Sequence, residues 1–167
     1  MLDDILLALL GGRDGSAWEL MQRHDELFGG AHRMDIVRVM AAVTRLERAG
    51  FLRVDAAVPE RMASGNRRTC SLTAAGRQRQ RAWLCEFNPD VSVEDVYVRG
   101  MLAVQTADEE TFETFVRNGL TATRVRMHTL TDDVAGAKAA FERETVRALA
   151  LWLHQLPDHR APRSAAG

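Results

Sequence analysis

The residues best suited to chemistry in this sequence are arginines grouped around one predicted turn. Residues 61–85 hold six arginines and no Asp or Glu, although the whole chain has a net charge of −1. A guanidinium group offers a fork of N–H donors that matches phosphate oxygens, and here no nearby carboxylate in the sequence competes for it. The segment therefore indicates a polyanionic partner. These arginines are Arg61, Arg67, Arg68, Arg77, Arg79 and Arg81.

Other kinds of chemistry find no support in the residue pattern. The five histidines form no HxxxH or HExxH pair, and the chain lacks GxSxG, GxxxxGK[ST] and GxGxxG segments. Cys70 and Cys85 fit neither a disulfide framework nor a CxxC metal pattern, and we expect both to be small buried apolar residues. We therefore expect no enzyme activity, no catalytic residues, no metal site and no cofactor.

The length and composition of the chain are typical of a globular protein. With 167 residues, 46% of them apolar and 27% charged, the chain can bury a core. The longest nearly apolar run, residues 5–10, is far too short for a membrane span, and the N-terminus lacks the basic region of a signal peptide. We expect a cytoplasmic protein with no membrane contact.

Three helices are predicted to position the first basic residues. Residues 2–10 have helical apolar spacing, and Ser16 with Glu19 forms the capping-box pattern of a second helix that ends at Gly29 and Gly30. A third helix is predicted over 35–49 and is stopped by Gly50. Its predicted inner face is Ile36, Val39, Met40, Val43 and Leu46.

The opposite face of the third helix combines basic and small residues, a pattern that can approach a phosphate backbone or enter a groove. A solvated surface is the competing interpretation. After this helix, residues 51–58 and 67–73 alternate like the strands of a hairpin, and Thr73 is predicted to cap a helix in which Gly76 packs closely. Three helices and a hairpin predict a winged helix-turn-helix. The predicted DNA contacts are Arg38, Ala41, Ala42, Arg45, Arg48, Arg61, Asn66, Arg67 and Arg68.

The C-terminal half is predicted to be helical. Residues 93–105 form a helix or a partly extended segment, Asp108 caps a long helix, and a last helix covers about 133–155. Two long amphipathic helices after a DNA-binding module are suited to dimerisation. The predicted fold is mainly α with a small β-hairpin wing: a winged helix-turn-helix over 1–86, a helical dimerisation domain over 87–158 and a flexible tail over 159–167. The predicted dimer contacts are Phe112, Phe115, Phe141, Ala148, Leu149, Trp152 and Leu153.

Two stretches, AAVTRLERAGFLRV and RRTCSLTAAGRQRQRAWL, resemble the PadR family of transcriptional regulators over about the first 85 residues. The sequence departs from the family pattern at Met40, Ala41 and Cys70, where that pattern has tyrosine, proline and tyrosine. The wing ending in LTxxG is shared with other winged-helix regulators, so a MarR-like protein is an alternative. The resemblance implies a C-terminal dimer with an effector pocket near its interface, for which the candidate residues are Trp83, Met101, Met127 and Trp152.

The resulting expectation is a homodimeric, sequence-specific DNA-binding transcriptional regulator. The resemblance implies a repressor, controlled by a small molecule that favours one dimer geometry. The expected partners are double-stranded DNA, a second copy of the chain and that effector. A winged helix used as a protein–protein adaptor, with the arginines meeting an acidic partner, is the alternative from another class.

Overall fold

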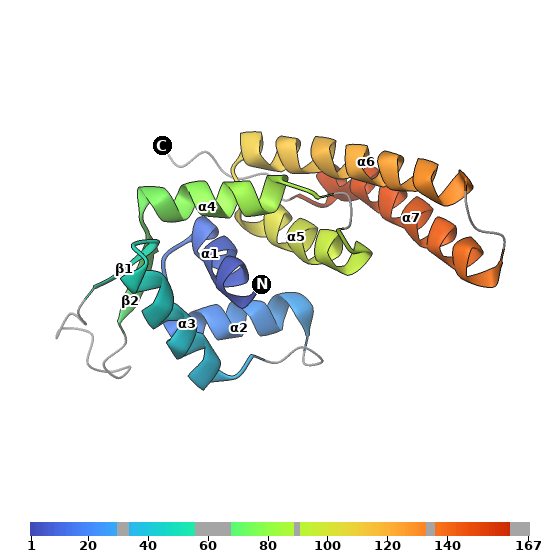
Figure 1. Cartoon of the computed structure of the whole chain (residues 1–167). Coiled ribbons are helices and arrows are strands. Elements are labelled where there is room, and N and C mark those ends of the chain that lie inside the picture. Colours follow the sequence, from blue (N-terminus) through green and yellow to red (C-terminus); the bar gives the residue numbers. More distant parts are fainter. Residues whose placement is uncertain (30–33, 56–67, 89–90, 133–135, 161–167) are drawn as a thin grey trace. The chain divides into compact units, whose positions relative to one another are not determined.

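The computed structural model describes residues 1–29, 34–55, 68–88, 91–132 and 136–160. The chain divides into two compact units, Met1–Trp83 and Leu84–Gly167, and each has its own set of elements (Figure 1). Among the described residues, no helix combines the length and the apolar character needed to cross a membrane.

Helix α1 (Leu2–Gly12) is the centre of the first unit. All six residues from Ile5 to Leu10 are buried, so this helix is enclosed rather than amphipathic. It contacts α2 (Ala17–Phe28), α3 (Ile36–Arg48) and strand β2 (Thr69–Leu72). The predicted helix is confirmed, but its apolar surface is wider than the single face that the leucine spacing indicates.

The start of α2 confirms the predicted capping box. The Ser16 hydroxyl accepts a hydrogen bond from the Glu19 backbone N–H at 3.3 Å. In return, the Glu19 carboxylate accepts one from the Ser16 backbone N–H at 2.7 Å. The bond from the Ser16 backbone N–H lowers the pKa of Glu19 below its ordinary value, and so does a further bond that the Ser16 hydroxyl donates to the Glu19 carboxylate at 2.8 Å. The helix start is therefore fixed by a pair of side chains three positions apart.

One face of helix α3 is buried against the rest of the first unit. Asp35 caps its first turn by accepting from the Val37 N–H at 2.9 Å, and Gly50, with φ of 77°, follows its end. A left-handed φ is easy for glycine and costly for other residues, so Gly50 lets the chain turn into the first strand. The buried residues of α3 are Val39, Ala42, Val43 and Leu46.

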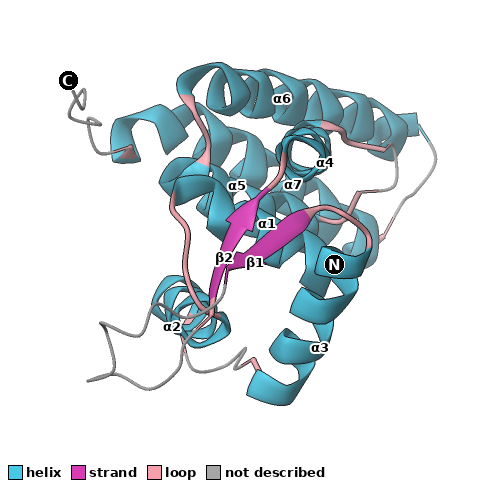
Figure 2. Cartoon of the chain, turned by 90° about the vertical axis from the view of Figure 1, so that its left-hand side faces the viewer, coloured by secondary structure: helices cyan, strands magenta, loops and turns pink. Residues whose placement is uncertain are grey.

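The wing is an antiparallel pair of β1 (Leu52–Asp55) and β2 with Leu52 opposite Leu72 (Figure 2). The loop between α1 and α2 adds a short third pairing that the sequence did not indicate. The Gly15 N–H donates to the Cys70 carbonyl at 3.1 Å, and the Cys70 N–H donates to the Gly15 carbonyl at 2.9 Å. The base of the wing is thus tied to the helical part of the unit.

Helix α4 (Ala74–Cys85) begins where the sequence predicted. The Thr73 hydroxyl accepts from the Gly76 N–H at 3.1 Å and donates to the Gly50 carbonyl at 2.7 Å. Gly76 lies directly against the backbone of Phe51, which confirms the close packing predicted there. Three helices, a two-stranded hairpin and a following helix make the first unit a winged helix-turn-helix, as predicted.

The second unit consists of α5 (Val93–Thr106), α6 (Glu109–Asp132), α7 (Ala137–Gln155) and the short 3-10 helix η3 (Leu156–His159). Residues 93–106 are helical throughout, so the partly extended alternative is wrong. Gly100 lies so close to α7 that an added Cβ would be 2.4 Å from the Trp152 ring. Asp108 caps α6 as predicted, accepting from the Thr111 N–H at 2.8 Å. The mainly helical fold is confirmed.

Candidate nucleic-acid interface

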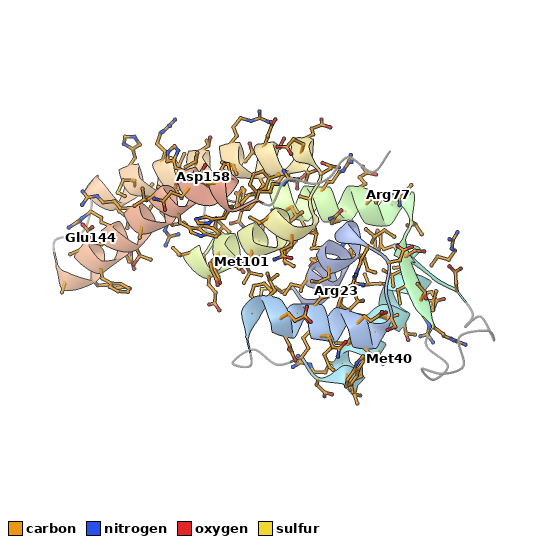
Figure 3. The ribbon with its side chains drawn as sticks, turned by 180° about the vertical axis from the view of Figure 1, so that it is seen from behind. Arg23, Met40, Arg77, Met101, Glu144 and Asp158 are labelled. Carbon is orange, nitrogen blue, oxygen red and sulfur yellow. The ribbon has the colours of Figure 1, made fainter. Side chains whose placement is uncertain are left out.

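The outward face of α3 is turned relative to the predicted one. Met40, expected in the core, has 52% of its surface exposed, and in Figure 3 its side chain extends away from the helix. Ala42, predicted to contact DNA, is fully buried between α3 and the rest of the unit. The assignment of Ala42 as a DNA contact is therefore wrong, because its methyl group is unavailable to any ligand.

The exposed face is centred on Val37, Ala41, Thr44 and Arg48, which follow one another at intervals of three or four residues. Val37 is 70% exposed, although a valine normally favours the interior. Val37 and Thr44 were not among the predicted contacts. A helical wheel whose buried face is centred on Ala42 and Leu46, and does not include Met40, would have placed Val37 and Thr44 on the outward face.

Arg38 and Arg45 lie on the edge of this face that is nearer α1, and we call them the edge arginines. Both are exposed, but their surroundings differ. The Arg45 guanidinium forms a two-point contact with the Asp3 carboxylate, through Nε at 3.2 Å and through Nη2. This contact raises the pKa of the Arg45 guanidinium, first through the hydrogen bonds and then through the charge of Asp3. Arg38 forms no hydrogen bond or ion pair with the described side chains around it.

A second acid of α1 makes an equivalent contact with α4. Nε and Nη2 of Arg79 donate to the Asp4 carboxylate at 3.0 and 2.8 Å. The Arg79 guanidinium also lies over the Phe51 ring, 4.8 Å from its centroid. A hollow of about 420 Å³ is lined by both acids and by the edge arginines. Its complete lining is Met1, Leu2, Asp3, Asp4, Arg38, Ala41, Arg45 and Arg79.

Most of the predicted wing contacts lie outside the described residues: Arg61, Asn66 and Arg67. Arg68, directly before β2, is described and exposed. Arg77 on α4 is used locally, because its Nη1 donates to the Leu72 carbonyl at 3.0 Å. The structure therefore brings Arg38, Ala41, Arg45 and Arg48 together on α3 and places Arg68 directly before β2, at the end of the strand pair where Asp55 lies opposite Thr69.

The predicted dimer contacts separate into two groups in the second unit. Phe112, Phe115, Leu149 and Leu153 are buried in that unit's own core, so their assignment to an interface between copies is wrong. Phe141 is 73% exposed, Ala148 is exposed and Trp152 is half-buried. The sequence pattern located the apolar residues of α6 and α7 but could not distinguish the intramolecular face from the outer one.

The predicted effector residues occupy different surroundings. Trp152 packs on Tyr97, with ring centroids 5.7 Å apart, and on Gly100. Met101 is half-buried on α5, and Trp83 is half-buried near the end of α4. Met127 lines a hollow of about 270 Å³ in the second unit, together with Leu120, Thr123, Arg124, Val146, Arg147, Ala150 and His154.

Cys70 is an inert residue in this fold, as predicted. It is 1% exposed at the centre of the wing base, and burial raises the pKa of its thiol to about 11. A thiol needs a low pKa and access to solvent to react readily, so Cys70 is a packing residue. Within the described part of the chain, no group of three or more His, Cys, Asp or Glu residues is arranged to hold a metal ion.

Solved structures of PadR-like proteins are similar to this chain. Bacillus subtilis PadR in complex with operator DNA has a TM-score of 0.47 and 12% identity, covering 95% of this chain and 97% of its own. A Streptococcus mutans protein has a TM-score of 0.41 and 13% identity, covering 94% and 96%. The PadR-like transcriptional regulator of Bacillus cereus has a TM-score of 0.41 and 15% identity, covering 95% and 99%.

The two PadR-like structures belong to the family that the sequence motifs resemble. No family model matches the chain, and no curated protein matches it. Because the identities and TM-scores are low, the function proposed below rests on the residues of the chain itself.

Proposed function

We propose that this protein is a sequence-specific DNA-binding transcriptional regulator that acts as a homodimer, most simply as a repressor in the cytoplasm. The observation that carries the proposal is the outward face of α3. That helix is the third of the winged unit, its inner face is fully packed, and its outer face combines three arginines with small side chains.

Each part of this face suits one component of duplex DNA. A major groove admits an α-helix, and the exposed Val37 and Ala41 methyl groups match the thymine methyl that lines it. Arg38 and Arg48 can reach the phosphates on the groove walls, and Arg68, at the loop end of the strand pair, can reach the flanking backbone. The arrangement therefore supports both backbone and base contacts.

Dimerisation is supported by an exposed stripe on α7. Its members recur at alternating intervals of four and three residues, all of them are exposed, and the large apolar ones are Phe141 and Leu151 at 73% and 59% exposure. That spacing is the one by which two helices pack along a seam. We call these the seam residues: Ala137, Phe141, Glu144, Ala148, Leu151 and Gln155. The labelled Glu144 in Figure 3 marks the position of the seam on α7.

The proposed control by a small molecule is assigned to a hollow of the second unit. Of the predicted effector residues, Met127 lines a described hollow, and its neighbours Leu120 and Val146 make that lining partly apolar. Arg124 and Arg147 at the same hollow would favour a ligand that also carries a negative charge. The effector proposed here is accordingly an apolar acid.

One observation favours a protein partner instead. Val37 and Met40 are both large, apolar and more than half exposed on α3. Exposed apolar residues beside charged ones are typical of protein interfaces as well as of DNA-binding surfaces. In an adaptor of this kind, α3 would bind an acidic partner through the same arginines.

Selection of duplex DNA from a random pool by the purified full chain tests the proposal. A dimeric regulator is expected to enrich an inverted repeat whose half-site spacing reflects the two α3 helices. Enrichment of no sequence, by a folded dimer, in the presence and absence of small apolar acids, would contradict the proposed function. Stable binding to an acidic protein with no DNA affinity at low salt would favour the adaptor.

A further inference from the structure

The contact between Asp3 and Arg45 joins the first turn of α1 to the proposed DNA-contacting helix. The two residues are 42 positions apart, and the contact is two-point. The Arg45 side chain is 59% exposed and that of Asp3 is 23% exposed, so the carboxylate lies behind the guanidinium rather than in open solvent. Asp3 therefore fixes an arginine that would otherwise move freely on the surface.

The atoms used in this contact determine which part of Arg45 remains available. A guanidinium carries five N–H donors, one on Nε and two on each Nη. Asp3 accepts from Nε and from Nη2, so both hydrogens of Nη1 and one of Nη2 stay unused by Asp3. These form a second two-donor fork on the side of the guanidinium away from Asp3. The carboxylate thus aims the free fork outward at the edge of the α3 face.

The charge of Asp3 affects which ligand this fork prefers. A phosphate binds arginine largely through its negative charge, and a carboxylate already in contact both offsets the positive charge and repels the phosphate. Binding of arginine to the neutral edge of a base depends instead on the direction of its N–H donors. Guanine presents two adjacent acceptors, O6 and N7, in the major groove, and an arginine fork matches both at once. Arg38, the other edge arginine, has no such carboxylate contact and therefore suits a phosphate.

We propose that Asp3 is a positioning residue for sequence readout, holding Arg45 so that its Nη1–Nη2 fork reads one guanine in each half-site. This inference rests on the proposed function as a DNA-binding regulator. It assigns a base-specific role to Arg45, a backbone role to Arg38, and a part in specificity to a residue of α1 that does not itself contact DNA.

The test begins with the sequence selected by the unaltered chain and replaces each guanine of a half-site with 7-deazaguanine, which lacks the N7 acceptor. Loss of affinity is expected at one guanine for the unaltered protein. Arg45→Ala and Asp3→Asn should abolish the sensitivity to that replacement. In both variants the preference for guanine over the other bases at that position should fall by about 5- to 150-fold. Binding to unrelated duplex should not weaken in Asp3→Asn, because a negative charge is removed.

Glu47→Gln is the matched control, since it removes one negative charge from an exposed position on α3 that points away from the edge arginines. It should retain the full guanine preference. Arg45→Ala alters an exposed side chain only, so it tests the readout even where Asp3→Asn reduces the melting temperature.

Three outcomes would overturn the inference. Unchanged guanine preference in Asp3→Asn, with tighter binding to every sequence, would show that Asp3 only competes with DNA for Arg45. Unchanged preference in Arg45→Ala would show that Arg45 does not read a base. Failure of the unaltered chain to select any sequence would remove the proposed function and this inference together, whereas selection of a sequence without a 7-deazaguanine effect would remove the inference alone.

Discussion

A Cβ atom placed on Gly76 would lie 2.0 Å from the carbonyl oxygen of Phe51. This contact joins the first turn of α4 to the residue that precedes β1. Because the obstructing atom belongs to the backbone, a rotamer change cannot relieve it. Gly76 is therefore required by the packing of the wing base rather than by its dihedral angles.

Gly76→Ala is expected to destabilise the first unit. In an ordinary helix interior, alanine is favoured over glycine by about 1 kcal/mol, but overpacking a tight contact typically costs about 1–3 kcal/mol. We expect the free energy of unfolding in urea to fall by about 1–2 kcal/mol. Gln78→Ala, at an exposed position of the same helix, is the control and should change it by less than about 0.5 kcal/mol. A Gly76→Ala protein more stable than the parent would contradict the close approach.

Ser16→Ala is expected to lower the free energy of unfolding by about 1 kcal/mol at neutral pH, because α2 loses its cap. The pKa of Glu19 is lowered in the folded protein by its bonds to Ser16. A carboxyl of this kind contributes stability at pH values above its unfolded pKa, and that contribution is lost as the pH falls through the folded pKa. The difference between parent and variant should therefore shrink in acid, measured by urea unfolding from pH 7 to about pH 3. An equal difference at every pH would exclude a contribution from the bond between the Ser16 hydroxyl and the Glu19 carboxylate.

Cys70 should be unreactive in the folded protein at neutral pH. Its thiol is buried and its pKa is raised to about 11, so almost no thiolate is present. In a Cys85→Ser background, iodoacetamide should label Cys70 only on unfolding or as the pH rises toward 11. The raised folded pKa means that the thiol's contribution to stability is complete below the unfolded pKa, about 8.5, and is lost as the pH rises toward 11. Rapid labelling at pH 7 would contradict the buried position.

Phe141→Glu and Leu151→Glu are expected to convert the proposed dimer to a monomer. Each places a charge in the apolar seam of α7, where it would be buried against a second copy. Sedimentation velocity of the full chain should show the change, with circular dichroism unaltered because both side chains are exposed in one copy. His154→Glu, at an exposed position of the same helix that is not one of the seam residues, is the control. A monomeric parent protein would remove the seam from consideration as a dimer contact.

Arg38→Ala should weaken binding to all duplex sequences to a similar degree. If Arg38 neutralises one phosphate per copy, the slope of log affinity against log salt should become shallower by about 0.9 for each copy. Measurement of affinity across a salt series, for a selected sequence and an unrelated one, separates this effect from base readout. A loss confined to the selected sequence would assign Arg38 to a base instead.

The sequence predicts the elements of this protein well because their signals are local. Caps such as Ser16 and Thr73 act within three residues, and the glycine stop at Gly50 acts on its own helix. The orientation of α3 was less predictable. Alanine contributes little to the hydrophobic pattern of a helix. Nevertheless, the packing of α3 buries Ala42 and leaves the larger Met40 exposed.

Contacts between distant parts of the chain could not be predicted. Asp3 and Asp4 fit the favourable acid positions of a helix start, and that local explanation hides their contacts with Arg45 and Arg79. On α7 the sequence shows apolar residues on two sides. Only the packing of Val146 and Leu153 into the core distinguishes the inner side from the exposed seam with Phe141.

The pairing of Gly15 with Cys70 leaves β2 with neighbours on both sides. This bridge occupies the outer side of β2 at Cys70, so among the described residues β1 has the more open edge for a further strand. That edge is four residues long and carries the exposed Arg53, which is paired with Asp55 at 3.2 Å. A short, charged edge resists strand addition and the aggregation that follows from it. Within the described part of the wing, growth of the sheet between copies is therefore disfavoured, and exposed helix faces are the better surface for self-association.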